Sequence, residues 1–247
     1  MYADWIAPDW PAPPGVWTVS TTRDGGVSAG VFTSFNLGQH VGDESASVAE
    51  NRQRLVSALN LKDEPRWLRQ VHGRRVAHLH GVPVQEPADA AVTTAPGEAC
   101  VIMTADCLPV LLCNRIGTRV AAAHAGWRGL AAGVLEATVK EMDVPPGEIL
   151  AWFGPAIGPK AYEVGDEVRQ AFVAQAADAA AAFLPTALAG KWRCDLYKLA
   201  RQRLEAVGVS AIYGGGLCTY SDPKRFFSFR RDGQCGRMAT LIWIDPS

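Results

Sequence analysis

The stretch ACVIMTADCLPVLLCNRIGTRVAAAHAGWRGLAAGVLEATVKEM, residues 99–142, decides the fold. It holds three apolar runs, at residues 99–105, 108–114 and 118–125, which have the length of β-strands and are separated by polar or turn residues. Residues 129–142 follow with the composition of a helix, and the prolines of DVPPG end it. Successive strands followed by a helix predict an α/β or α+β fold.

The remainder of the chain continues this pattern in both directions. Further helices are predicted at residues 45–61, from about residue 166, and after Asp195, which would cap the last one. Further strands are predicted at residues 16–22, 66–73, 148–154, 210–217 and 238–244. Because no repeat or long linker divides the sequence, we predict a single layered domain, residues 1–247, with a mixed β-sheet core flanked by helices.

The composition excludes several classes of function. The 247 residues carry a net charge of −1, and lysine and arginine form no long run, so no nucleic-acid partner is expected. No uninterrupted apolar segment approaches the roughly 18–20 residues that span a bilayer, so no membrane partner is expected either. The first residues lack the basic and apolar regions of a secretory signal. We expect a cytoplasmic monomer.

The six cysteines suggest neither a disulfide framework nor a structural zinc ribbon. The sequence carries no secretory signal and no CxxC spacing, which those two arrangements require. Most of these cysteines are therefore expected to be small buried hydrophobic residues.

Three side chains stand at the ends of predicted strands and could form one site. His124 closes the third apolar run, Cys107 follows the first, and His72 ends the segment at 66–73. If neighbouring strands pair simply, Cys107 and His124 lie at one sheet edge, where ligands usually gather. Two imidazoles and a thiolate suffice for tetrahedral zinc with an open fourth position, and Asp106 could orient a ligand or shuttle a proton.

The spacing of this trio fits no standard zinc pattern. Along the chain, 35 residues separate His72 from Cys107 and 17 separate Cys107 from His124. A structural role therefore stays open, with Cys107 in the core and both histidines bonded to backbone carbonyls.

Long blocks of the sequence resemble a known family. The chain is similar to proteins once described as polyphenol oxidases or laccase-domain proteins, whose members are now described as purine nucleoside phosphorylases with adenosine deaminase activity. The resemblance covers nearly the whole chain and rests on TTRDGGVSAGVFTSFNLGQHVGD, LRQVHG, TADCLPVLL, AAHAGWRGL, FGPAIGP, YEVGDEV, CTYSDPKRFFSFRRDG and GRMATLIW.

The resemblance implies the following site and chemistry. The family's zinc ligands correspond to His72, Cys107 and His124, and its fold is shared with toxin deamidases that use a Cys–His pair. The implied reaction converts adenosine, inosine, guanosine or methylthioadenosine with phosphate to the free base and ribose 1-phosphate.

Phosphorolysis needs groups that hold phosphate and nucleoside. Arg230, Arg231 and Arg128 are candidates for charge-assisted bonds to phosphate, although each could instead be a surface or structural arginine. Asn36 could bond to ribose or base, or could organise a turn. Trp127 could stack on the purine or pack beneath its loop.

Other functions remain open. Cys107 could be the nucleophile of a Cys–His hydrolase, with His124 as its base, and the family has been linked to peptidoglycan editing. Copper could occupy the same three ligands, but only three of the five histidines remain after the trio takes two, too few for a trinuclear oxidase centre. The usual zinc-deaminase motif is missing from the sequence, and a purely structural metal site would use four ligands.

Overall fold

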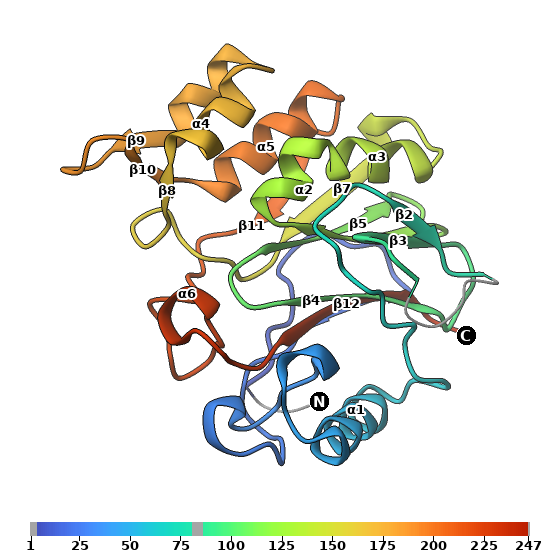
Figure 1. Ribbon diagram of the computed structural model, residues 1–247. Helices are drawn as coiled ribbons and strands as arrows, with labels where there is room; N and C mark the ends of the chain where they lie inside the picture. Colours follow the sequence, from blue (N-terminus) through green and yellow to red (C-terminus); the bar gives the residue numbers. More distant parts are fainter. Residues whose placement is uncertain (1–3, 81–85, 247) are drawn as a thin grey trace.

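The computed structural model describes residues 4–80 and 86–246, and its centre is a pair of stacked β-sheets (Figure 1). The larger sheet is mixed and has the strand order β11-β7-β5-β6-β3-β2. The outer pairs β11–β7 and β3–β2 are parallel, whereas the inner pairs are antiparallel. Its strands are β2 Val76–His78, β3 Ala90–Thr93, β5 Leu108–Asn114, β6 Val120–Ala125, β7 Ile149–Phe153 and β11 Ala211–Gly214.

Two smaller sheets complete the β structure. One is antiparallel, lies against the large sheet and has the order β1-β12-β4, with bounds Val16–Ser20, Met238–Ile244 and Ala99–Thr104. The other is a peripheral sheet of order β8-β10-β9, with bounds Glu163–Gly165, Lys191–Cys194 and Phe183–Pro185.

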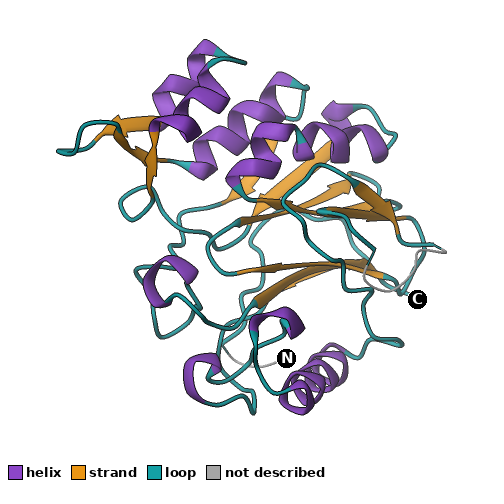
Figure 2. Ribbon diagram, viewed as in Figure 1, coloured by secondary structure: helices purple, strands orange, loops and turns teal. Residues whose placement is uncertain are grey.

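Helices cover the outer faces of the two stacked sheets (Figure 2). On the side of the large sheet lie α2 Trp127–Ala132, α3 Val134–Glu141, α4 Asp166–Val173 and α5 Leu196–Ala206; α1 Ser45–Leu59 lies beyond the small sheet. The remaining helical segments are α6 Phe229–Asp232, η1 Gly30–Phe32, η2 Gln39–Val41, η3 Pro146–Glu148 and η4 Ala177–Ala182. In the part of the chain that the structure describes, no helix is both long enough and apolar enough to cross a membrane.

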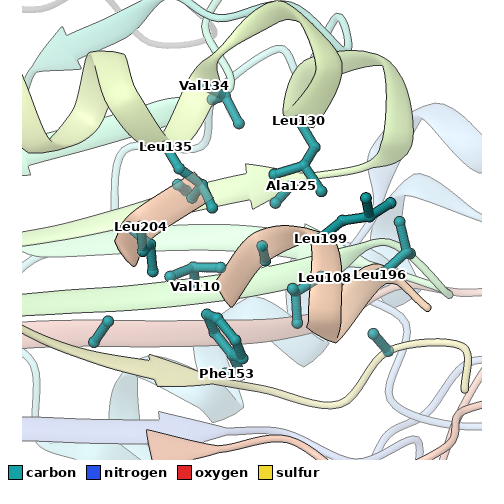
Figure 3. Packing of buried hydrophobic residues seen from close by; sticks show 14 of the residues in the cluster. Leu108, Val110, Ala125, Leu130, Val134, Leu135, Phe153, Leu196, Leu199 and Leu204 are labelled. Carbon is teal, nitrogen blue, oxygen red and sulfur yellow. The ribbon is translucent and has the colours of Figure 1, made fainter. Parts of the chain in front are cut away.

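The alternation of side chains along the strands produces three packed layers. Leu108 and Val110 of β5 pack with Leu199 and Leu204 of α5 in the layer between the large sheet and its helices (Figure 3). The next residue, Leu111, points to the other face, where it packs between the two sheets. A third layer joins the small sheet to α1.

Strand β6 lies inside the large sheet, and its alanines allow close approach on both faces. Ala121 and Ala123 belong to the helix-side layer, whereas Ala122 belongs to the layer between the sheets. All three are fully buried. A strand that is covered on both sides therefore requires small side chains here, and alanine meets this requirement.

The predicted α/β class, with sheets flanked by helices, is confirmed, and three local expectations are corrected. Residues 66–73 form no strand, and only an isolated bridge joins Arg69 to Pro87. The helix expected at 129–142 is divided at Gly133, whose φ of +91° is a left-handed conformation suited to glycine. Finally, the segment at 99–105 does not pair with its neighbour but forms β4 of the other sheet, where Ile102 packs between the two sheets and Val101 packs toward α1.

Candidate functional site

Cys107 lies in the short connection between β4 and β5, where the chain crosses from one sheet to the other. The preceding residue, Asp106, has a φ of +94°, which is uncommon for a residue other than glycine. The next residue, Leu108, pairs with Ala125 in the antiparallel β5–β6 ladder. Cys107 therefore stands at the same sheet edge as the end of β6, as the sequence predicts.

The two histidines approach Cys107 from different segments. His124 lies near the end of β6 opposite Pro109, and His72 lies in a loop with a φ of +60°. The two imidazole rings meet edge to face with centroids 4.7 Å apart. His72 is exposed, Cys107 is half-buried and His124 is buried, so the group is open to solvent on one side.

One ligand atom from each of these residues lies within 4.8 Å of the other two. The distance from Cys107 Sγ to His72 Nε2 is 4.0 Å. Among the described residues, this is the only group of three His, Cys, Asp or Glu side chains arranged in this way. Gly126 packs directly against this group, because a Cβ at that position would lie 2.8 Å from Cys107 Sγ.

Asp89 is a residue of this site that sequence reasoning missed. Its carboxylate is fully buried and lies 2.9 Å from His124 Nδ1. It also accepts hydrogen bonds from the backbone N–H groups of Val71, His72 and Gly73. The signal in the sequence is the position of Asp89, directly before the apolar strand that begins at Ala90. An aspartate buried at such a position requires hydrogen-bond partners.

The charges of Cys107 and His124 stabilise each other. Burial raises the pKa of the Cys107 thiol, but the charge of His124 and hydrogen bonds from both imidazoles outweigh it and lower this pKa to about 6. Burial lowers the pKa of His124, but the Cys107 thiolate and the hydrogen bond to Asp89 raise it to about 9. Burial also raises the pKa of Asp89, yet the bonds from His124 and Gly73 bring it below its usual value.

These properties fit a zinc or copper ion. A metal requires a deprotonated thiol and a neutral imidazole nitrogen. Cys107 already favours the thiolate, whereas His124, whose pKa is raised, would release a proton when a metal binds. Because His124 Nδ1 faces Asp89, its Nε2 is the nitrogen left for a metal. Tetrahedral zinc places its sulfur and nitrogen ligands about 3.5 Å apart, close to the observed 4.0 Å between Cys107 Sγ and His72 Nε2.

Asp106 hydrogen-bonds to Thr219 and to the backbone of Arg230, and its expected roles of orienting a ligand or shuttling a proton stay predictions. One carboxylate oxygen accepts a hydrogen bond of 2.6 Å from the hydroxyl of Thr219, and the other accepts one of 2.7 Å from the backbone N–H of Arg230. Asp106 is 8% exposed. One of its oxygens is engaged by the loop before α6 and the other by α6 itself. The carboxylate beside His124 is instead Asp89, because β3 is the neighbour of β6 in the sheet.

Arg230 lies close to this edge of the sheet through its backbone contact with Asp106. Its side chain is exposed, with the guanidinium 5.0 Å from the centre of the Tyr162 ring. One guanidinium N–H donates to the carbonyl oxygen of Glu163 at 2.6 Å. Tyr162 is a second residue that sequence reasoning missed; burial raises its pKa, and the charge of the Cys107 thiolate raises it further.

The structure places the other predicted binding residues as follows. Trp127 is half-buried at the start of α2 and packs against the helix-side layer, while the exposed Arg128 stacks on its ring at 4.5 Å. Arg231 donates to the carbonyl oxygens of Thr219, Tyr220 and Phe226, which ties it to its own loop.

Asn36 is fully buried, and its side chain makes four hydrogen bonds within the protein. Its amide donates to Gly38 and Asp43, and its oxygen accepts from the backbone of Gly38 and Arg237. These bonds use the ordinary capacity of the side chain and organise the surrounding loops. Its role in substrate binding stays a prediction.

A family model described as multi-copper polyphenol oxidoreductase laccase matches residues 17–245. A purine nucleoside phosphorylase of Pseudomonas aeruginosa is 57% identical over 240 residues, which cover 97% of this chain and 98% of the relative. The purine nucleoside phosphorylase YfiH of Escherichia coli strain K12 is 56% identical over 240 residues with the same shares.

Solved structures resemble the whole chain in the same way. A crystal structure of a Neisseria meningitidis protein is 49% identical, with a TM-score of 0.93, and covers 98% of this chain and 99% of its own. YlmD from Geobacillus stearothermophilus is 31% identical, with a TM-score of 0.88, and the match covers 99% and 98% of the two chains.

Proposed function

This chain belongs to the family of multi-copper polyphenol oxidoreductase laccases, and on that premise we propose that it is a zinc-dependent purine nucleoside phosphorylase. The reaction would convert a purine nucleoside and phosphate to the free base and ribose 1-phosphate. The names of the relatives from Pseudomonas and Escherichia support this class of reaction. Adenosine, inosine, guanosine and methylthioadenosine are the proposed substrates.

The observation that carries the proposal is the convergence of His72, Cys107 and His124. These three residues come from separate segments, yet their ligand atoms lie within 4.8 Å of one another. They would hold zinc with one position open toward the solvent-exposed side of His72. When bound, the metal supplies a Lewis-acidic positive charge that can polarise an oxygen of the reactants.

The residues around this group would bind and orient the reactants. Phosphorolysis brings an anion to the sugar carbon C1′, and the exposed guanidinium of Arg230 has N–H groups beyond the one that donates to Glu163. Asp106 fixes the backbone of Arg230 beside Cys107, so its proposed role is to position the anion-binding arginine. Trp127 and Arg128 would form another wall of the substrate site, and Asn36 would bond to the ribose or base.

We propose adenosine deamination as a second reaction of the same site. An open metal position beside charged groups suits attack on the purine ring as well as on C1′. The distinction lies in the products, because deamination consumes water, releases ammonia and gives inosine, and it needs no phosphate.

A Cys–His hydrolase is the second candidate function, including the peptidoglycan-editing role. The observation that favours it is the alignment of Asp89, His124 and Cys107, in which a carboxylate orients an imidazole beside a low-pKa thiol. The same atoms would then act without a metal, with Cys107 as nucleophile.

Copper oxidase chemistry is the third candidate, and the histidine count argues against its multicopper form. His40, His78 and His80 lie outside the group of three ligands that the described residues form, and His78 instead pairs with Glu141 at 2.7 Å. Copper could still bind the His72–Cys107–His124 ligand set.

Metal analysis joined to product assays tests these alternatives. We expect the purified protein to contain one zinc and to release ribose 1-phosphate from adenosine only when phosphate is present. Cys107→Ala should lose both metal and turnover, and full metal content in that variant would refute the ligand assignment. Inosine formed without phosphate would identify deamination, whereas cleavage of a peptidoglycan precursor by chelator-treated protein would favour the hydrolase.

The expectations of a single domain, a monomer and a cytoplasmic location stay predictions. Gel filtration with light scattering at micromolar concentration would measure the oligomeric state directly.

A further inference from the structure

We propose that Asp89 is a positioning residue that sets the geometry of both histidines at once, His124 through its ring and His72 through its backbone. The inference rests on the proposed metal site and deepens it. It concerns how the ligand set is held in place.

The burial of Asp89 requires a reason. A fully buried carboxylate is costly unless every lone pair is used, and aspartate is rarely buried without partners. Asp89 meets this requirement with four hydrogen bonds, all of which go to residues of the site or beside it. All four hydrogen bonds of the carboxylate that the structure describes therefore serve the site.

The contact with His124 fixes both the ring and the strand that carries it. The imidazole Nδ1 lies 2.9 Å from Asp89 Oδ1, and the backbone N–H of His124 donates to the carbonyl oxygen of Asp89 at 2.7 Å. With a proton held on Nδ1, Nε2 is free to bind a metal in one orientation.

The contact with the His72 loop acts on the backbone. His72 has a φ of +60°, which costs roughly 1–2 kcal/mol for a residue other than glycine. Three successive N–H groups, of Val71, His72 and Gly73, donate to the Asp89 carboxylate at 3.1, 2.8 and 2.7 Å. An anion surrounded by three amide donors stabilises this turn, and the turn directs the His72 ring toward Cys107.

Asp89→Asn is the decisive substitution because it keeps the size of the side chain. An amide offers one acceptor oxygen, and its NH2 group would face donor N–H groups or His124 Nδ1. We expect the affinity for zinc, measured by competition with a chromophoric chelator, to fall about 10–100-fold. The absorption bands of the cobalt-loaded protein should shift, and the amides of residues 71–73 should exchange faster with deuterated water.

Asp43→Asn is the matched control. Asp43 also organises a loop, through Ser28, Asn36 and the backbone of Glu44, but none of the three ligands lies in that loop. This variant should lose stability and keep the zinc affinity and the cobalt spectrum of the parent. If Asp89→Asn binds zinc within threefold of the parent, or if both variants lose affinity equally, the inference is wrong.

A measurement on the unmodified protein covers the case in which Asp89→Asn fails to fold. In zinc-loaded protein labelled with nitrogen-15 at histidine, we expect a slowly exchanging proton on His124 Nδ1 and none on Nε2. Zinc bound through Nδ1 would overturn the inference. Because these readouts measure the metal site rather than turnover, absence of phosphorolysis would refute the proposed function and leave this inference standing.

Discussion

Replacement of His124 by glutamine in metal-free protein should abolish the thiolate character of Cys107. The thiol pKa of about 6 arises because the charge of His124 and hydrogen bonds from both imidazoles outweigh burial. At that pKa about 90% of Cys107 is thiolate at pH 7, whereas at 9.0 or above only about 1% would be. Alkylation by iodoacetamide at pH 7 should therefore slow by roughly two orders of magnitude.

The sign of the pH dependence follows from the two pKa values. The lowered pKa of Cys107 contributes stability that is fully present when the pH is above the ordinary pKa of a thiol. This contribution is lost as pH falls through about 6. The raised pKa of His124 stabilises the fold below about 6.5, and this contribution is lost as pH rises through about 9. The thiolate–imidazolium pair should therefore dominate between about pH 6 and pH 9 in metal-free protein.

The assay is thiolate absorbance at 240 nm against pH, in a background that carries Cys218→Ser. Cys218 is half-exposed with a lowered pKa and would otherwise contribute, while the other four cysteines are buried with raised pKa values. His78→Gln, at an exposed histidine paired with Glu141, is the control and should leave the midpoint near 6. A His124→Gln midpoint within one pH unit of the parent would refute the electrostatic account.

Three further substitutions test the site and its support. Gly126→Ala should lower zinc affinity at least tenfold, because its Cβ would lie 2.8 Å from Cys107 Sγ. The control Gly147→Ala, whose Cβ would have nothing within 4 Å, should leave zinc affinity unchanged. Equal zinc affinities in the two variants would contradict this packing argument. Asn36→Ala should lower the free energy of unfolding in urea by about 3 kcal/mol, since it strands buried donors, and a loss under 1 kcal/mol would show that water replaces them. Arg230→Gln should raise KM for phosphate about 10–100-fold with metal content intact, and a fall in kcat alone would argue against phosphate contact.

The sequence allowed correct prediction of what local patterns determine. Length and apolarity identify β4, β5 and β6, and the antiparallel β5–β6 pair brings Cys107 and His124 to one edge. The division of the strands between two sheets was not predictable in this way, because β4 and β5 are both continuous apolar runs with no polar face to distinguish them.

The parts of the site that escaped prediction depend on contacts distant in sequence. Asp89 meets His124 because β3 pairs with β6, and a register of strands 35 residues apart is not visible in either segment alone. The bond from Thr219 to Asp106 was not predictable for a similar reason, since the two residues lie more than 100 positions apart in the sequence. Tyr162 gives no signal in its own segment, because Arg230, which lies over its ring, is distant in the sequence.

The alanine run of β6 limits how this protein can diverge. Ala122 is pressed between two sheets, and its neighbours Ala121 and Ala123 are pressed against helices, so any larger side chain must separate whole layers. Such a displacement would reach His124 within one or two residues. Natural drift and laboratory selection alike should therefore retune specificity through exposed loop positions, while the three alanines beside His124 remain resistant to change.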